Sequence, residues 1–214
     1  MSQITSIFST PMMVLDLPSN DAALERIASA AQAYHCRRAD DDAAFAKRTG
    51  RSRISRPDLL ADLTPQDRAY LLEPINAAVR QFIGAGLQDP AADERQLAVR
   101  GFARYYAPGG RIVPHTHFDA DVVVSIYLQT GADGTGFPGA PASDLILIDP
   151  VLRGYPYRAP FHRIAVRAGM AVVFPSYVLH ETDPSPGQRV IAGLEYKVIS
   201  HDMEKVFNPI ESYC

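Results

Sequence analysis

The spacing of apolar residues changes near residue 95, and this change limits the fold more than any other feature of the sequence. The segment before it has helical periodicity, with apolar side chains at i, i+3, i+4 and i+7: Leu24, Ile27, Ala28 and Ala31. The segment after it consists of short β-like runs separated by proline and glycine: 96–106, 122–129, 144–148, 161–166, 170–174 and 189–199. Many short strands with such turns predict a sandwich or a closed barrel, of which the jelly roll is one form.

A second helix is expected to begin at Thr64-Pro65. Threonine is a good N-cap, and proline suits the first helical position because its missing N–H has no helical partner there. An apolar stripe continues from this start until it is ended by Gly84. We expect Pro74 to kink this helix or to divide it in two.

The length of 214 residues suits one domain with a sizeable core. We therefore expect a helical region over residues 1–94, packed on a β core over 95–200, and a tail over 201–214. The formal net charge of -3 gives no general attraction to nucleic acid or to an anionic membrane. No apolar stretch approaches the ~20 residues that cross a bilayer, and no signal peptide is evident. A cytoplasmic location is the default expectation.

Two cysteines are too few for a disulfide framework or a thiolate metal motif, so a metal site in this chain would use histidine and carboxylate ligands. Residues 47–56 contain five basic side chains, which we interpret as a solvated loop, although they could contact a phosphate. The glycine-rich stretch 131–142 is expected to be a mobile loop. It lacks the GK[ST] ending of a phosphate-binding loop.

The residues best suited to chemistry are concentrated in the cluster His115-Thr116-His117-Phe118-Asp119. On an extended chain, the side chains at 115, 117 and 119 point to the same side, so two of them can bind one ion. His180, which follows a strongly apolar run, is the candidate ligand from elsewhere in the chain. Two histidines and one carboxylate on one face of a metal leave three positions open for a cosubstrate and oxygen. The remaining histidines are expected to be structural: His35, His162 and His201.

Arg189 follows the distal histidine by nine residues and opens another predicted strand. Its planar guanidinium could form a bidentate pair with the remote carboxylate of a dicarboxylate cosubstrate, which a lysine could not do. Tyr127, on the strand after the histidine cluster, is a weaker candidate for a hydrogen bond to the same cosubstrate.

Three segments between about residue 100 and residue 195 carry a resemblance to a known family: YYAPGGRIVPHTH, VVVSIYL and AGMAVVFPSYVLHETDPSPGQR. The chain resembles the 2-oxoglutarate/iron(II) oxygenase superfamily, and within it a group of uncharacterised bacterial oxygenases with an H-x-H signature. The resemblance implies a double-stranded β-helix core, with Fe(II) and 2-oxoglutarate as cofactors. It also implies hydroxylation of an unknown substrate, with release of succinate and carbon dioxide.

The usual H-x-D motif of this superfamily can be placed on the sequence in two ways. The spacing from Tyr106 places His115 first and His117 at the carboxylate position, whereas a literal H-x-D selects His117 and Asp119. His117 and His180 are metal ligands in both alignments. We rank His115 ahead of Asp119 as the third ligand, and the other residue could orient a ligand imidazole.

Other functions stay open at this point. One is a cupin-type dioxygenase or isomerase that uses three histidines without 2-oxoglutarate, and another is a non-catalytic barrel that only binds a ligand. A nucleic-acid demethylase of the same superfamily would need the basic run 47–56 to form a groove. We expect a small molecule or a peptide as substrate, and we leave a homodimer open.

Overall fold

The computed structural model describes residues 10–49, 59–130, 144–148 and 161–199, without the side chains of residues 37–49. The expected mobile loop 131–142, the tail 201–214 and the side chains of the basic run 47–56 lie outside the described residues. Among the described helices, none combines the length and the apolar character needed to cross a bilayer.

The amino-terminal region contributes one strand and the helices of the fold: β1 (Met13–Asp16), α1 (Asp21–Thr49), α2 (Leu59–Asp62), α3 (Pro65–Gln81) and a π-helical turn, η1 (Phe82–Gly86). The strand β1 pairs antiparallel with β6 (Met170–Pro175), which lies more than 150 residues later in the chain. The amino-terminal region is therefore not purely helical, because its first element completes the edge of a sheet.

Helix α3 begins as the sequence predicts. The hydroxyl of Thr64 accepts a hydrogen bond from the backbone N–H of Asp67 at 3.1 Å, and Pro65 occupies the first helical turn. Pro74 lies inside one continuous helix, so of the two expected outcomes, a kink or a division into two helices, the division does not occur. The helix continues through this proline because its apolar face, which includes Ile75, is fully buried, and tertiary packing outweighs the local cost.

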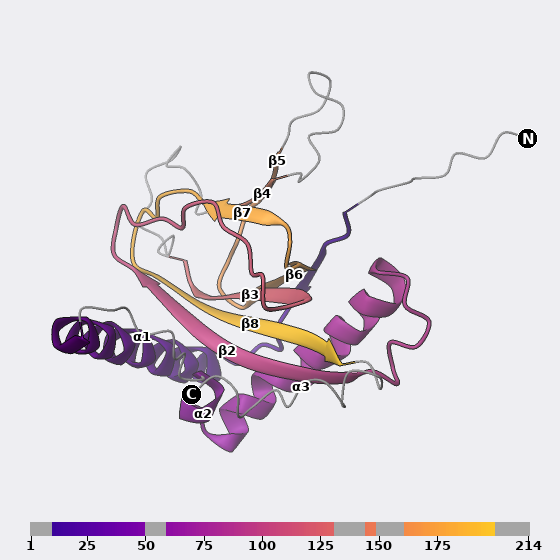
Figure 1. Cartoon of the computed structure of the whole chain (residues 1–214), viewed down its shortest axis with the longest axis horizontal. Helices are drawn as coiled ribbons and strands as arrows, with labels where there is room; N and C mark the ends of the chain where they lie inside the picture. The colour runs from indigo at the N-terminus through magenta and orange to yellow at the C-terminus, as the bar shows by residue number, and fades with distance from the viewer. Residues whose placement is uncertain (1–9, 50–58, 131–143, 149–160, 200–214) are drawn as a thin grey trace, which may run out of the picture.

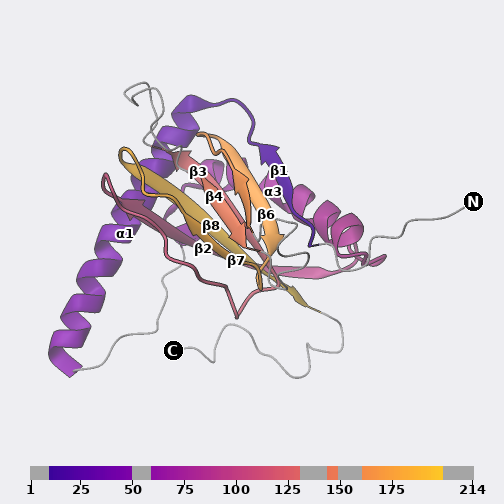
Figure 2. The same ribbon diagram turned by 90° about the horizontal axis from the view of Figure 1, so that it is seen from above.

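The β core consists of two antiparallel sheets. The larger sheet has the strand order β1-β6-β3-β8-β2 and contains β2 (Gln96–Tyr106), β3 (Val122–Gln129) and β8 (Arg189–Ile199). The smaller sheet has the order β5-β4-β7 and contains β4 (Leu145–Ile148), β5 (Phe161–Ile164) and β7 (Leu179–Thr182). Figure 2 shows β2, β8, β3 and β6 side by side, in the order that the backbone pairing gives.

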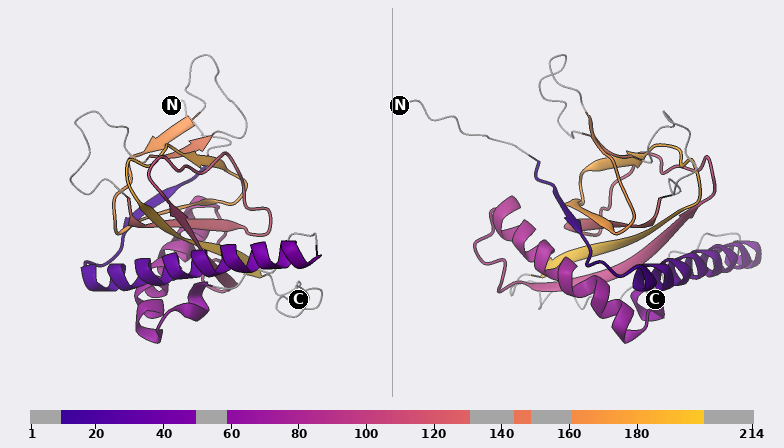
Figure 3. Two further views of the ribbon diagram at one scale, coloured as in Figure 1. Left: turned by 90° about the vertical axis from the view of Figure 1, so that its left-hand side faces the viewer. Right: turned by 180° about the vertical axis from the view of Figure 1, so that it is seen from behind.

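The larger sheet is buried on both faces because its central strands are apolar on both sides. On β3, Val124 and Ile126 belong to the apolar cluster beneath the helices, whereas Val123 and Tyr127 face the smaller sheet. The helices cover one face of the sheet, and β4, β5 and β7 lie over the other (Figure 1 and Figure 3). This arrangement confirms the predicted fold class, a mainly β core with flanking amino-terminal helices.

Candidate metal centre

Backbone pairing brings two of the predicted ligands together. His115 and His180 form an antiparallel bridge, in which the N–H of His115 donates to the carbonyl of His180 at 3.1 Å and the reverse bond measures 3.0 Å. Two residues later, the N–H of His117 donates to the carbonyl of Ser176 at 3.0 Å. The segment 115–117 is therefore extended and runs alongside residues 176–180. The side chains of His115 and His117 point to the same side of this segment.

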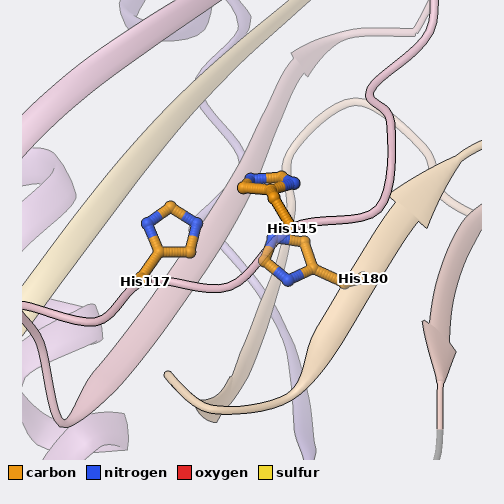
Figure 4. A group of neighbouring side chains, drawn as sticks. All are labelled: His115, His117 and His180. Atoms are coloured by element: carbon orange, nitrogen blue, oxygen red, sulfur yellow. The ribbon is translucent and has the colours of Figure 1, made fainter.

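The three imidazoles form a compact cluster between the two sheets (Figure 4). The ring centroids of His115 and His180 are 4.2 Å apart, and that of His117 lies 5.0 Å and 5.2 Å from them. One nitrogen from each ring lies within 4.8 Å of the other two. Small rotations of these rings would bring all three nitrogens to the ~2.1 Å that separates an imidazole from a bound metal.

Hydrogen bonds select which nitrogen of each ring is free for a metal. Nδ1 of His115 lies 3.0 Å from the carbonyl oxygen of Val113, and Nδ1 of His180 lies 3.0 Å from that of Val178. A carbonyl oxygen only accepts, so Nδ1 holds the proton in both rings. The lone pair is therefore on Nε2, and the backbone holds each ring in the tautomer that binds a metal through this atom.

The imidazoles of His115 and His180 are electrically neutral at physiological pH. Burial lowers the pKa of His180 to about 3, and burial also lowers the pKa of His115. His180 is 3% exposed and packs against the Phe174 ring in a T-shaped arrangement, with 4.8 Å between the ring centroids. Neutral rings keep their lone pairs available, which a metal ligand requires.

The third imidazole is held by a carboxylate. Nδ1 of His117 lies 2.6 Å from Oε1 of Glu195, while the other oxygen of Glu195 accepts a hydrogen bond from Nε of Arg100. Burial raises the pKa of Glu195, but the bonds from His117 and Arg100 outweigh burial and hold this pKa at about 2. Glu195 is therefore a buried anion directly behind one ring of the cluster.

Asp119 takes a different position from the three histidines. Its side chain is 68% exposed, and its Oδ2 lies 3.3 Å from Nη2 of Arg100. Among the described residues, the group that could hold a metal consists of His115, His117 and His180. The structure thus places His115, the residue that we ranked first, beside His117 and His180. It places Asp119 in an ion pair at the surface.

The sequence analysis did not identify the aromatic wall of this centre. The ring of Phe102 stacks against His117, with 5.5 Å between centroids and 25° between planes. Phe102 pairs across the sheet with Gly193, where a Cβ would lie only 2.0 Å from Cζ of the phenylalanine. The absence of a side chain at residue 193 therefore makes room for the ring, as a glycine inside a strand often does where groups approach closely.

Arg189 and Tyr127 bring buried and unpaired hydrogen-bond donors to the same face of the larger sheet. Nη2 of Arg189 donates to the carbonyl of Asp183 at 3.1 Å. Its Nε and Nη1, and the hydroxyl of Tyr127, are buried without a hydrogen-bond partner in the described part of the chain. Burial lowers the pKa of Arg189 and raises that of Tyr127. Unpaired buried donors are costly, so these groups suit a ligand that accepts hydrogen bonds, and a carboxylate fits the arginine fork.

Known structures resemble the chain in fold, whereas no protein-family model and no curated protein matches it. A prolyl-4-hydroxylase of Pseudomonas putida superposes with a TM-score of 0.53 over 90% of both chains, at 18% identity. A viral collagen prolyl hydroxylase of Paramecium Bursaria Chlorella virus-1, in complex with 2-oxoglutarate, gives 0.50 over 88% of this chain and 96% of its own, at 14% identity. The chain has the double-stranded β-helix fold of the 2-oxoglutarate/iron(II) oxygenases.

A third structure extends this likeness beyond the prolyl hydroxylases. The non-haem, α-ketoglutarate-dependent carbocyclase SnoK from nogalamycin biosynthesis gives a TM-score of 0.53 over 87% of this chain and 79% of its own, at 11% identity. At such low identities the likeness concerns the fold, which these oxygenases share although their substrates differ. The closer similarity to uncharacterised bacterial members stays a prediction.

Proposed function

We propose that the protein is an Fe(II)- and 2-oxoglutarate-dependent oxygenase that hydroxylates a substrate not yet identified. The observation that supports this most strongly is the pair of unpaired buried donors, Arg189 and Tyr127, on the same sheet face as a cluster of three imidazoles. The donors suit the carboxylate of 2-oxoglutarate, and the imidazoles suit iron. The fold is the one in which oxygenases of this kind combine the two.

His115, His117 and His180 would hold the iron through their Nε2 atoms. Three ligands on one face leave three coordination positions for 2-oxoglutarate and oxygen. We favour His115 over Asp119 as the third ligand, because Asp119 is engaged by Arg100 at the surface. Apolar neighbours such as Phe174, which is fully buried, would keep water away from the centre.

The guanidinium of Arg189 would bind the distal carboxylate of 2-oxoglutarate with two parallel hydrogen bonds, and the Tyr127 hydroxyl would donate a third. When bound, iron and 2-oxoglutarate would together activate dioxygen, one atom of which enters a substrate C–H bond and the other the succinate that is released with carbon dioxide. Arg189 orients the cosubstrate from a fully buried position, so its charge is little screened by water.

The variant Arg189→Lys tests this assignment, because lysine keeps the positive charge but loses the planar fork. We expect 2-oxoglutarate to bind roughly 10- to 100-fold more weakly, the cost of losing a charge-assisted hydrogen bond, while metal affinity stays unchanged. Arg167→Lys is the matched control, since Arg167 forms an exposed ion pair with Asp16. The measurements are succinate formation and calorimetric titration with iron(II) under anaerobic conditions.

The same experiment separates the rival functions. The presence of three histidines favours, as second candidate, a cupin-type dioxygenase or isomerase that binds metal without 2-oxoglutarate. Unchanged 2-oxoglutarate turnover in Arg189→Lys would remove the cosubstrate role of this arginine. Metal binding without any 2-oxoglutarate affinity in the wild-type protein would favour the cupin-type function. Absence of iron affinity would leave only a non-catalytic barrel.

We also propose that residues 1–94 pack as a layer on the core 95–200 within one domain, and that the protein works in the cytoplasm. The low cysteine content and the exposed, free Cys36 support a reducing compartment. The net charge of -3 favours a small-molecule or peptide substrate over nucleic acid. A homodimer stays an open prediction, to be checked by light scattering.

A further inference from the structure

The three-histidine cluster differs in charge from the usual H-x-D ligand set, which contains two histidines and one carboxylate. Three neutral imidazoles would leave the full double charge of iron(II), whereas one ligating carboxylate would reduce it to a single charge. A partly buried site, in which His180 is buried and His115 and His117 are half-buried, stabilises the larger charge less well than water does. An anion near the cluster would therefore favour metal binding.

Glu195 is in position to supply this anion. It is 4% exposed, and its Oε1 is 2.6 Å from Nδ1 of His117, a length typical of a charge-assisted hydrogen bond. The sheet itself fixes the carboxylate, since Arg100 lies directly opposite Glu195 in the pairing of β2 with β8 and donates to its other oxygen. Each oxygen thus has a defined partner, one in the extended segment 115–117 and the other on β2.

We propose that Glu195 serves as the carboxylate of this metal centre, placed one imidazole away from the ion. The inference rests on the proposed metal-binding function. Through its hydrogen bond, Glu195 holds Nε2 of His117 toward the other two histidines and makes this ring a more electron-rich ligand. The centre then has the charge of a two-histidine, one-carboxylate site although its three ligands are imidazoles.

Asp119 adds a second part to this network. Arg100 alone would neutralise Glu195, but its Nη2 also pairs with Asp119 at 3.3 Å. Two carboxylates share one guanidinium, so the network keeps a net negative charge behind His117. The exposure of Asp119 makes its share smaller than that of the buried Glu195, because solvent screens it. Glu195 is thus a positioning residue, and Asp119 supports it through Arg100.

The decisive variant is Glu195→Gln, which keeps the size of the side chain and an oxygen that can accept from His117 but removes the charge. We expect Fe(II) and Co(II) to bind roughly 10- to 100-fold more weakly in anaerobic competition titrations, as is usual when a carboxylate behind a ligand histidine is lost. The midpoint potential of the bound iron should become more positive, since the oxidised ion depends more on a nearby anion. A purely structural residue would not move this potential.

Glu181→Gln is the matched control. Glu181 follows His180 directly, but its side chain lines a hollow on the outer face of the smaller sheet with Ile146 and Ile148. The same substitution there should leave metal affinity and potential unchanged. If Glu195→Gln behaves like this control, Glu195 has no electrostatic role at the metal and the proposal is wrong.

Arg100→Met keeps the proposal testable even if Glu195→Gln folds poorly. This variant removes the cation that partly neutralises Glu195, so metal affinity should hold or rise and the potential should become more negative. If the ion pair only stabilised the sheet, both variants would weaken metal binding, and a fall in affinity in Arg100→Met would overturn the proposal. A wild-type protein that binds neither metal would instead reject the proposed function itself.

Discussion

The close approach of Phe102 to Gly193 can be tested by adding a single methyl group. In Gly193→Ala the new Cβ would lie 2.0 Å from Cζ of Phe102 and 2.4 Å from each Cε. Carbon atoms pack at about 3.5 Å, so the ring would have to retreat by about 1.5 Å. The stacked ring of His117 opposes this movement on one side, and the pairing of β2 with β8 limits the backbone.

Overpacking of this kind costs about 1–3 kcal/mol, which corresponds to a fall in melting temperature of roughly 3–10 °C for a chain of this length. We expect Gly193→Ala to lose this stability in urea denaturation of the metal-free protein. Metal affinity should fall as well, because the displaced ring presses on His117. Gly84→Ala is the matched control: its Cβ would meet Ala92 at 3.4 Å, an ordinary contact. That variant should stay within about 0.5 kcal/mol of the wild type.

A double-mutant cycle with Phe102→Ala tests whether the clash with Phe102 causes the loss of stability in Gly193→Ala. Removing the ring removes the clash, so the double variant should be more stable than the sum of the single effects by at least about 1 kcal/mol. Additive single effects, or a Gly193→Ala protein as stable as the wild type, would refute the reasoning. The strand would then accommodate a side chain at residue 193 by another route.

Two further predictions concern groups that the metal-free protein leaves in costly states. Tyr127→Phe removes a buried donor that has no partner, so the free energy of unfolding of the metal-free protein, measured by thermal melting, should stay equal or rise by about 1 kcal/mol. Calorimetry should show that the same variant binds 2-oxoglutarate more weakly. The pKa of His180 is about 3 in the folded protein and about 6.5 for an exposed imidazole in the unfolded chain, so the unfolded chain binds more protons between these values. Stability of the metal-free protein should therefore fall as the pH is lowered from about 6.5 toward 3, and a melting temperature that is flat from pH 7.5 to 5 would contradict this.

The strands that the sequence predicts well are those with strong local patterns. The segments predicted over 96–106, 122–129 and 189–199 coincide with β2, β3 and β8, because long apolar or alternating runs end at clear turn residues. The strand β1 was missed because four residues carry little pattern of their own. Its place depends on pairing with β6 at the other end of the sequence, and such long-range pairing leaves no local trace.

The strand β7 was missed for a different reason, which is connected with function. Its buried positions are His180 and Thr182, both polar, so the segment lacks the apolar alternation of an ordinary strand. Polar residues occupy the inner face because that face contributes to the candidate metal centre. The rule that fails here is that the buried face of a strand is apolar, and a functional site is where this rule is expected to fail.

The sequence indicates that Glu195 is unusual, although the sequence alone does not identify its partners. It stands in RVIAGLEYKVI, a strand whose other residues are mostly apolar, and a charge inside such a run requires a partner. Its partners, Arg100 and His117, are 95 and 78 residues away in the sequence. The signal could therefore identify a buried ion pair, but only the register of β8 beside β2 and β3 could connect it with the histidine cluster.

The choice between His115 and Asp119 depends on where the extended chain ends. The sequence argument placed residues 115, 117 and 119 on one side, which holds only if the backbone stays extended throughout. In the structure a turn begins after His117, and the N–H of Ala120 donates to the carbonyl of His117 at 3.3 Å. Alternation therefore applies to the two histidines and fails for Asp119, whose carboxylate is turned to Arg100. The same turn that removes one carboxylate from the cluster leaves His117 free to pair with another, Glu195.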